Sequence, residues 1–190
     1  MTGEHIYIEP PTLHTERLIL EPLSAEHIPT YQEHFANYEV IRHLSAHVPW
    51  PYPEDGVETY VLDRVLPSQG RTRWDWAICL KEAPGVAVGS IGLWIPGAPE
   101  SRGFWLAEHL WGQGLMTEAT HPVNDFWFDV LGFDTLILAN ARGNERSGRI
   151  KASSGAVKID LIEFAFVDPT YTQSDVWELT REAWRENQRG

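Results

Sequence analysis

The sequence predicts a single α+β domain over residues 1–190, with a mostly antiparallel central sheet covered by helices on both faces. Two observations support this prediction. Extended segments between residues 73 and 106 are separated by Pro-Gly pairs, which is typical of consecutive β-hairpins. The other segments alternate between helical and extended periodicity, and no repeat, linker or low-complexity tract divides the chain.

The composition is that of an ordinary globular protein. Hydrophobic residues make up 43% of the chain and charged residues 22%. No apolar run approaches the ~18 residues that a membrane span needs. The first residues lack the basic and apolar segments of a secretory signal. We therefore expect a cytoplasmic protein, either a monomer or a homodimer.

The net charge and the cysteines and histidines argue against nucleic-acid-binding, disulfide-linked and metal-binding proteins. The formal net charge of −12 opposes binding to nucleic acid and favours cationic partners. Cys79 is the only cysteine, so an intrachain disulfide is excluded, and its apolar neighbours indicate a packing role. The eight histidines show no ligand spacing with a third donor, so we expect no metal site.

The first half of the chain is assigned from alternation, helical spacing and turn residues. Ser24 is placed to cap the first helix. The elements predicted in order are a strand over 15–22, a helix over 24–36, a loop over 45–53, a helix over 54–66, and strands over 73–80, 86–94 and 102–106.

The second half begins with a helix that is expected to start near Gly114, to kink at Pro122 and to end at Gly132. The apolar stripe predicted for it consists of Met116, Ala119, Val123, Phe126 and Val130. The elements predicted after it are a central strand over 135–139, a helix over 144–154 that Asn144 caps and Gly155 ends, a strand over 157–167, and a polar tail from Asp168.

The stretch from Gly103 to Ala119 is the most informative part of the chain. It reads as a strand, a tight loop and the start of a helix. Gly112 and Gly114 lack a Cβ, so they can take positive φ and admit a ligand close to the backbone. Unpaired amides at a helix start suit a phosphate group. A P-loop is excluded, because the chain has no Gly-x4-Gly-Lys-Ser/Thr.

This stretch resembles motif A of the GNAT superfamily of N-acetyltransferases. Its form, Gly-aromatic-Trp-Leu, Trp-Gly-x-Gly, Thr-Glu-Ala, is most similar to the RimJ/RimL-type ribosomal-protein N-terminal acetyltransferases. The resemblance implies a GNAT fold over about residues 15–184. Trp111 and Met116 depart from the wider superfamily pattern. The residues that the resemblance assigns to acetyl-CoA in this stretch are Trp105, Leu106, Gly112, Gln113, Gly114, Leu115, Met116 and Thr117.

A second motif follows at residues 143–150. Asn144 and Ser147 resemble the family's Asn-x-x-Ser signature, in which Asn supports the pantetheine arm or the helix start and Ser lies near the thioester sulfur. An ordinary Asn cap with a chance serine is the alternative. Arg149 and Lys151 are candidates for the adenosine phosphates, or else part of a solvated face. Residues 153–156, Ser-Ser-Gly-Ala, depart from the family's usual Lys-Leu-Gly-Phe.

The implied reaction is attack of a neutral amine on a thioester carbonyl. A peptide α-amino group has a pKa near 7.7–8.0, so its neutral form is accessible at pH 7. We expect backbone amides around Trp105 and Leu106 to stabilise the oxyanion. Ser147 is the candidate proton donor to the departing thiolate.

Glu163 is the candidate base. Odd positions of the strand over 157–167 are apolar except Glu163, so alternation would put its carboxylate on a buried face and raise its pKa. Enzymes of the RimL type, which this chain resembles, carry a Glu on this strand. A β-bulge that turns Glu163 to solvent is the alternative, and Glu108 and His109 are then the fallback bases.

The function expected from these motifs is transfer of acetyl from acetyl-CoA to a primary amine at a protein or peptide N-terminus. A small-molecule amine acetyltransferase and a catalytically silent acyl-CoA-binding module are the alternatives. The chain also holds many tryptophans, which can line an acceptor groove or pack in the core. Those considered for the groove are Trp50, Trp74, Trp76, Trp94 and Trp105.

Overall fold

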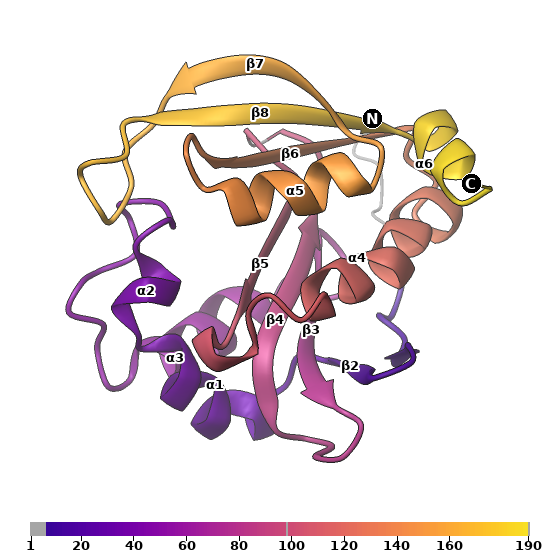
Figure 1. Ribbon diagram of the computed structural model, residues 1–190. Coiled ribbons are helices and arrows are strands. Elements are labelled where there is room, and N and C mark those ends of the chain that lie inside the picture. The colour runs from indigo at the N-terminus through magenta and orange to yellow at the C-terminus, as the bar shows by residue number, and fades with distance from the viewer. Residues whose placement is uncertain (1–6, 98, 190) are drawn as a thin grey trace, which may run out of the picture.

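The computed structural model describes residues 7–97 and 99–189 and contains two sheets (Figure 1). The larger sheet has the order β1-β2-β3-β4-β5, with every neighbouring pair antiparallel. This confirms the predicted hairpins of residues 73–106, in which only the start of β4 differs, by one residue. The strand predicted over 15–22 is shorter, because β2 begins at Leu18. The strands are β1 Leu13–His14, β2 Leu18–Pro22, β3 Arg73–Leu80, β4 Ala87–Trp94 and β5 Arg102–Leu106.

Strand β3 lies at the centre of this sheet and is buried on both faces. Trp74, Trp76 and Ile78 belong to one hydrophobic cluster, whereas Ala77 and Cys79 belong to another. Side chains on a strand point alternately to the two faces, so the alternation divides β3 between two cores. Cys79 is fully buried, which agrees with a packing role.

Helices cover both faces of the larger sheet, as the fold class predicts (Figure 1). The N-terminal helices pack on the face of Cys79, and α4 packs on the face of Trp76. The helices are α1 Ile28–Phe35, α2 Tyr38–Ile41, α3 Gly56–Tyr60 and α4 Leu115–Asp125, and single π-helical turns extend α3 over Val61–Val65 and α4 over Phe126–Val130. None of the described helices is long and apolar enough to cross a membrane.

The helix that contains Pro122 differs from its prediction in two ways. Pro122 lies inside α4, and the chain changes from α-helical to π-helical geometry only at Phe126, four residues later, in the turn that ends at Val130. Val130 was predicted to face the core but is 54% exposed. One π turn changes the number of residues per turn, so the stripe of Met116, Ala119, Val123 and Phe126 does not continue to Val130.

The smaller sheet has the order β6-β8-β7, with both pairs antiparallel. Its central strand, β8 Gln173–Thr180, falls in the segment that was predicted to be a polar tail, and that prediction is wrong. The strand predicted over 157–167 is shorter, because β7 ends at Glu163. The remaining elements are β6 Thr135–Ala141, α5 Glu145–Ser153, β7 Val157–Glu163 and α6 Arg181–Asn187.

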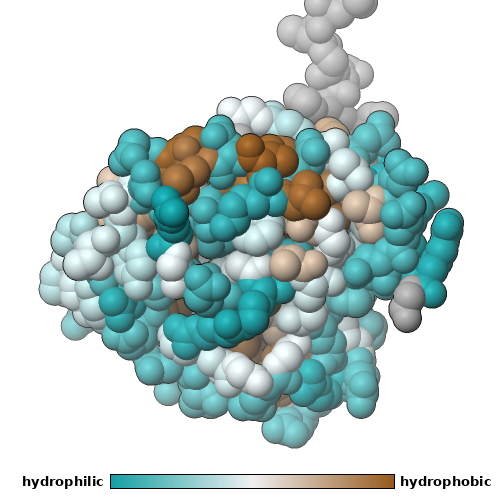
Figure 2. Space-filling view, turned by 45° about the horizontal axis from the view of Figure 1, so that its top comes forward, coloured by the Kyte–Doolittle hydropathy of each residue, from teal (hydrophilic) through white to brown (hydrophobic). Residues whose placement is uncertain are grey.

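Strand β7 is an edge strand with a solvent-exposed face. Its register against β8 shifts between Lys158 and Asp160, and Val157, Ile159 and Leu161 are 39–59% exposed. In Figure 2, brown apolar side chains gather near the top of the view, on the side where Figure 1 places β7. The prediction that the odd-numbered residues of this strand form a buried face is therefore wrong.

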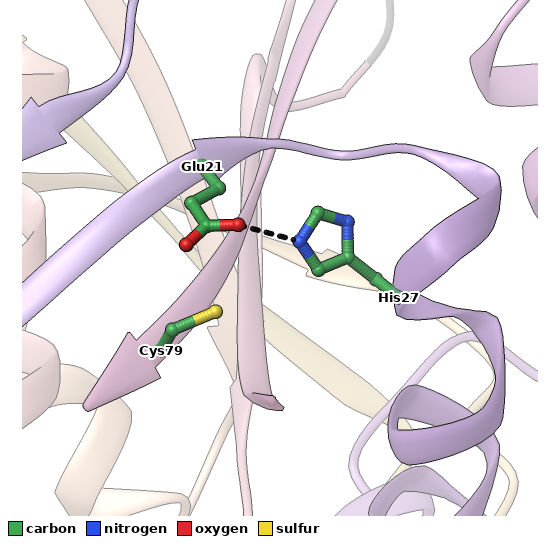
Figure 3. Close-up of side chains that lie close together, drawn as sticks. All are labelled: Glu21, His27 and Cys79. Carbon is green, nitrogen blue, oxygen red and sulfur yellow. Dashed lines mark hydrogen bonds and ion pairs between the residues drawn. The ribbon is translucent and has the colours of Figure 1, made fainter. Parts of the chain in front are cut away.

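A small polar cluster fixes the N-terminal helix to the sheet. The Ser24 amide donates to Nδ1 of His27 (3.1 Å), so Nε2 carries the hydrogen that points to Glu21 Oε2 (3.1 Å). Figure 3 shows that Cys79 lies beside this pair. Burial, and then the nearby Glu21 charge, raise the pKa of Cys79 to about 11, so the thiol stays protonated.

Candidate active site

A cleft of about 630 Å³ is lined by residues of both sheets. Its walls are β5 and β6, which are joined at one end by a hydrogen bond from Ser101 N to Ile137 O (2.8 Å). Helix α5 forms another side. The loop before α4 lines one part of the cleft, which we call the glycine end, and the segment after α2 lines another part, which we call the acceptor end.

The glycine end has the predicted backbone geometry. Gly112 and Gly114 both have φ of +77°, and Gly114 caps α4. A Cβ on Gly112 would meet no atom within 4 Å, so the chain leaves room there. The first helical bond of α4 is made by Glu118 N to Gly114 O (3.0 Å). The three preceding amides are therefore available to an anion, together with the positive end of the helix.

Arg17, which the sequence analysis missed, does not line the cleft but lies beside the glycine loop. Its Nε donates to Glu118 Oε2 (2.7 Å), and its Nη1 donates to Gln113 O (2.9 Å). Its Nη2 would lie 3.6 Å from a Cβ on Gly114. Partial burial acts to raise the pKa of Glu118, but hydrogen bonds from Thr15 and Arg17 lower it below its ordinary value. The carboxylate thus holds a cation next to the glycine loop.

The backbone of β5 presents amides to the cleft. Ala107 N bonds Val88 O on β4 (2.8 Å), and register alternation then turns the amides of Trp105 and Gly103 toward β4. The amides of Phe104 and Leu106 point the other way. Of the two amides predicted to stabilise the oxyanion, that of Trp105 points to β4, so only that of Leu106 remains a candidate. Trp111 Nε1 donates to Leu106 O (2.8 Å), which fixes this strand end.

Helix α5 carries the second motif. The Asn144 side chain accepts from Ser147 N (3.3 Å), and Gly155 has φ of +91° beyond the helix, so the predicted cap and stop are confirmed. Asn144 and Ser147 both line the cleft, as does the exposed side chain of Arg149. Ser154 Oγ donates to Lys151 O (2.7 Å), so the small residues that depart from the family pattern are satisfied within the last turn.

Lys151 does not have the exposed position that either a phosphate contact or a solvated face requires. It is 2% exposed, and its Nζ donates to Ser147 Oγ (2.7 Å). Arg102, also 2% exposed, donates from Nη1 to Asn124 Oδ1 (2.6 Å). Burial, and then the Arg102 charge, lower the pKa of Lys151 below its ordinary value, against an opposing effect of Glu100. Helical spacing alone could not reveal this cluster.

The acceptor end contains a histidine that the sequence analysis also missed. Glu39 and His43 line this part of the cleft, together with Ile162, Phe164 and Phe166. Burial, and then the charges of Arg42 and Arg146, lower the pKa of His43. His43 is therefore neutral at pH 7 and can accept a proton.

Four predicted site residues do not line the cleft. Glu163 is exposed and accepts a hydrogen bond from Gln173 Nε2 (2.8 Å), because the cleft side of this segment carries Ile162 and Phe164. The structure therefore contradicts its expected burial. Glu108 accepts from Asn37 Nδ2 (2.8 Å), and His109 is exposed. Gln113 is exposed and contributes its carbonyl to Arg17. The predicted residues that do line the cleft are Trp105, Leu106, Gly112, Gly114, Leu115, Met116, Thr117, Asn144, Ser147 and Arg149.

The tryptophans divide between core and cleft. Trp74 and Trp76 are 3% and 0% exposed, and their indoles donate to backbone carbonyls of Ile8 and Pro11. Trp50 is 44% exposed. Of the five tryptophans considered for the groove, Trp94 and Trp105 line the cleft.

Comparison with known proteins identifies this architecture. The model of the acetyltransferase (GNAT) domain matches residues 17–157. A putative acetyltransferase from T. thermophilus is 25% identical, with 97% of this chain and 96% of that chain covered and a TM-score of 0.76. No curated protein matches the sequence significantly.

Two more distant structures share the fold. Mycobacterium smegmatis RimJ in complex with CoA-disulfide is 15% identical, covers 91% of this chain and 88% of its own, and has a TM-score of 0.77. Spermidine N-acetyltransferase from Vibrio cholerae in complex with CoA and spermine is 14% identical, covers 88% and 98%, and has a TM-score of 0.72. The match over most of the chain shows that this protein belongs to the GNAT acetyltransferase family and is an acetyl-CoA-dependent N-acetyltransferase.

Proposed function

We propose that this protein transfers the acetyl group of acetyl-CoA to the α-amino group of a protein or peptide N-terminus. The observation that supports it is one continuous cleft, which joins the glycine end, Ser147 and the acceptor end with its neutral His43. The residues fit acetyl-CoA as co-substrate: positive-φ glycines and the start of α4 suit its pyrophosphate. Asn144 and the outward amides of β5 suit its amide-containing arm.

His43 is the proposed proton acceptor for the attacking amine. An α-amino group has a pKa near 7.7–8.0, so a fraction of the acceptor is already neutral at pH 7 and a weak base is enough to deprotonate the remainder. The lowered pKa of His43 keeps its imidazole neutral at pH 7. His43 therefore accepts a proton directly or through water as the amine attacks.

The charge that develops on the carbonyl oxygen requires fixed donors. The Leu106 amide points away from β4 and is held in place by the Trp111 hydrogen bond to the same residue. It is the proposed oxyanion donor. Ser147, on the facing helix, is the proposed proton donor to the departing thiolate.

A small polyamine is the second candidate acceptor. Glu39 and Glu100 line the cleft, and the net charge of −12 attracts cations of either class. The RimJ and spermidine acetyltransferase structures share the fold with this chain at similarly low identity, so they do not decide between the acceptors. The low basicity of α-amino groups, matched to a weak base such as His43, favours the N-terminal substrate.

The test is release of free CoA from acetyl-CoA with a matched set of acceptors. One peptide has a free N-terminus, a second is the same peptide with a blocked N-terminus and an internal lysine, and spermidine is the third. We expect turnover with the first and none with the second. Turnover with spermidine alone would establish the small-amine reading. Tight acetyl-CoA binding without turnover of any acceptor would indicate a silent acyl-CoA-binding module.

A further inference from the structure

Lys151 is a buried lysine inside the cleft. Lysines are almost never fully buried unless they are paired, yet this side chain is 2% exposed and lines the cavity. It lies one helical turn after Ser147 on the same face of α5. Its Nζ is 5.2 Å from the centre of the Phe104 ring on β5. The ammonium group is therefore directed between α5 and the strand that offers its amides to the cleft.

The hydrogen bond between Lys151 and Ser147 sets the direction of the serine hydroxyl. An ammonium group only donates, so Ser147 Oγ accepts from Nζ at 2.7 Å. The single hydrogen of Ser147 is then free to point to another acceptor. Ser147 lines the cleft, so this hydrogen can reach a group bound there. A nearby positive charge also makes the hydroxyl a stronger proton donor.

The charged groups that face Lys151 from the neighbouring elements are Glu100, in the segment before β5, and Arg102, on β5. Arg102 is held by Asn124 of α4, and its Nε and Nη2 have no partner among the described residues. Burial and the Arg102 charge lower the pKa of Lys151, and burial raises the pKa of Glu100. The ammonium proton of Lys151 is therefore held less tightly than that of an exposed lysine.

We propose that Lys151 is the proton source behind Ser147, so that the pair protonates the thiolate that leaves during acetyl transfer. As the C–N bond to the acceptor forms and the C–S bond breaks, Ser147 gives its hydrogen to sulfur and takes one from Lys151. The proton lost by the acceptor nitrogen passes to His43 and then to water, and Lys151 regains a proton from solvent. The inference rests on the proposed acetyl transfer, and Lys151 is a positioning residue, since it acts through Ser147.

The first test replaces Lys151 with a side chain of similar length that carries no proton. We expect Lys151→Met to lower kcat on the order of 10- to 100-fold and to change the KM for acetyl-CoA by less than about twofold. Met suits a buried position, so the thermal midpoint should not fall. Lys81→Met is the control, because Lys81 is exposed and does not line the cleft; it should behave as wild type.

The pH profile separates proton supply from a structural role. Lys151 acts when protonated and its pKa is lowered from the ordinary lysine value, so wild-type kcat should fall as pH rises through a point below the ordinary pKa of a lysine. This falling limb should be absent in Lys151→Met. Glu100 favours the charged lysine, so Glu100→Gln should move the limb to lower pH. A falling limb that persists unchanged in Lys151→Met would overturn the inference.

A double-mutant cycle gives an independent result. If the two residues act as one unit, Ser147→Ala combined with Lys151→Met should be about as slow as the slower single variant. If the kcat of the double variant is lowered by the product of the two single losses, or if Lys151→Met has the wild-type kcat, the proposal is contradicted while acetyl transfer itself stands. Failure of the wild-type protein to release CoA with any amine would instead overturn the proposed function, and this inference with it.

Discussion

The glycine end of the cleft exposes backbone groups from one short stretch, Gly112 to Thr117, whereas the Lys151 cluster, made of Lys151, Ser147, Glu100 and Arg102, is assembled from side chains of separate segments. The glycine loop depends on φ of +77° at two positions. The cluster depends on the burial of Lys151 and Arg102, each 2% exposed. A positive φ restricts the residue at that position largely to glycine. The free energy of a buried charge depends instead on all the groups around it.

This difference predicts distinct failures. Substitutions at the glycine end should weaken or abolish acetyl-CoA binding and leave the pH dependence of the remaining turnover unchanged. Substitutions at the acceptor end and around Lys151 should leave acetyl-CoA binding nearly intact and alter the rate.

Gly114→Asp should abolish measurable acetyl-CoA binding. The new side chain would have to adopt a φ of +77° and would place a carboxylate at the start of α4, where a phosphate would bind. Isothermal calorimetry measures the loss. Gly132→Asp is the matched control, because Gly132 has φ of +79° at the far end of the same helical segment. Equal affinities in the two variants would mean that the glycine loop does not bind the cofactor.

His43→Gln should lower kcat by a factor on the order of 10², in the lower range for a general base, with unchanged acetyl-CoA affinity. The pKa of His43 is lowered from its ordinary value, so wild-type kcat should rise with pH through a point below 6.5. This rising limb should be lost in the variant. His109→Gln is the control, because His109 lies outside the cleft. If His109→Gln is the slower variant, the fallback assignment from the sequence becomes the better one.

Arg17→Gln should raise the KM for acetyl-CoA about threefold to tenfold, in line with loss of one charge-assisted contact, at constant kcat. The guanidinium is fixed by Glu118 and Gln113 beside the glycine loop. Since the contact is exposed, added salt should reduce the difference. Steady-state kinetics at two salt concentrations measure it. Arg64→Gln should show no change, because Arg64 is exposed, lies on the turn after α3 and, unlike Arg17, does not bond the glycine loop.

Glu163→Gln should change kcat by less than about twofold, as is usual for exposed polar sites. Glu163 is exposed and bonded to Gln173. A large loss of kcat with intact binding would restore Glu163 as the base and would require β7 to turn its other face to the cleft.

The parts of the fold that were predicted correctly are specified by local sequence. Pro-Gly turns and alternation located β3, β4 and β5 almost to the residue. Strand β8 was missed because its polar residues suggested a tail. In the structure β8 pairs on both sides, and Ser174 and Asp175 are buried, the latter bonded by Lys158 Nζ (2.8 Å). That pairing depends on residues far away in the sequence.

The site divides in the same way. The glycine loop and the Asn144 cap could be predicted, because a few adjacent residues determine them. Glu163 was misplaced because alternate apolar residues were read as a buried face, whereas β7 is an exposed edge. His43, Arg17 and the burial of Lys151 were not predicted, since each depends on contacts with distant segments. No local pattern distinguishes a buried lysine from one on a solvated helix face.

The most direct measurement is a crystal structure of this protein with CoA, because it examines the glycine loop and Ser147 together. The account predicts the pyrophosphate on the amides of Leu115 to Thr117, and the CoA sulfur within hydrogen-bonding distance of Ser147 Oγ, with Lys151 Nζ still bonded to that oxygen. Pyrophosphate bound away from the glycine loop, or a sulfur nearer to Glu163 or His109 than to Ser147, would contradict it.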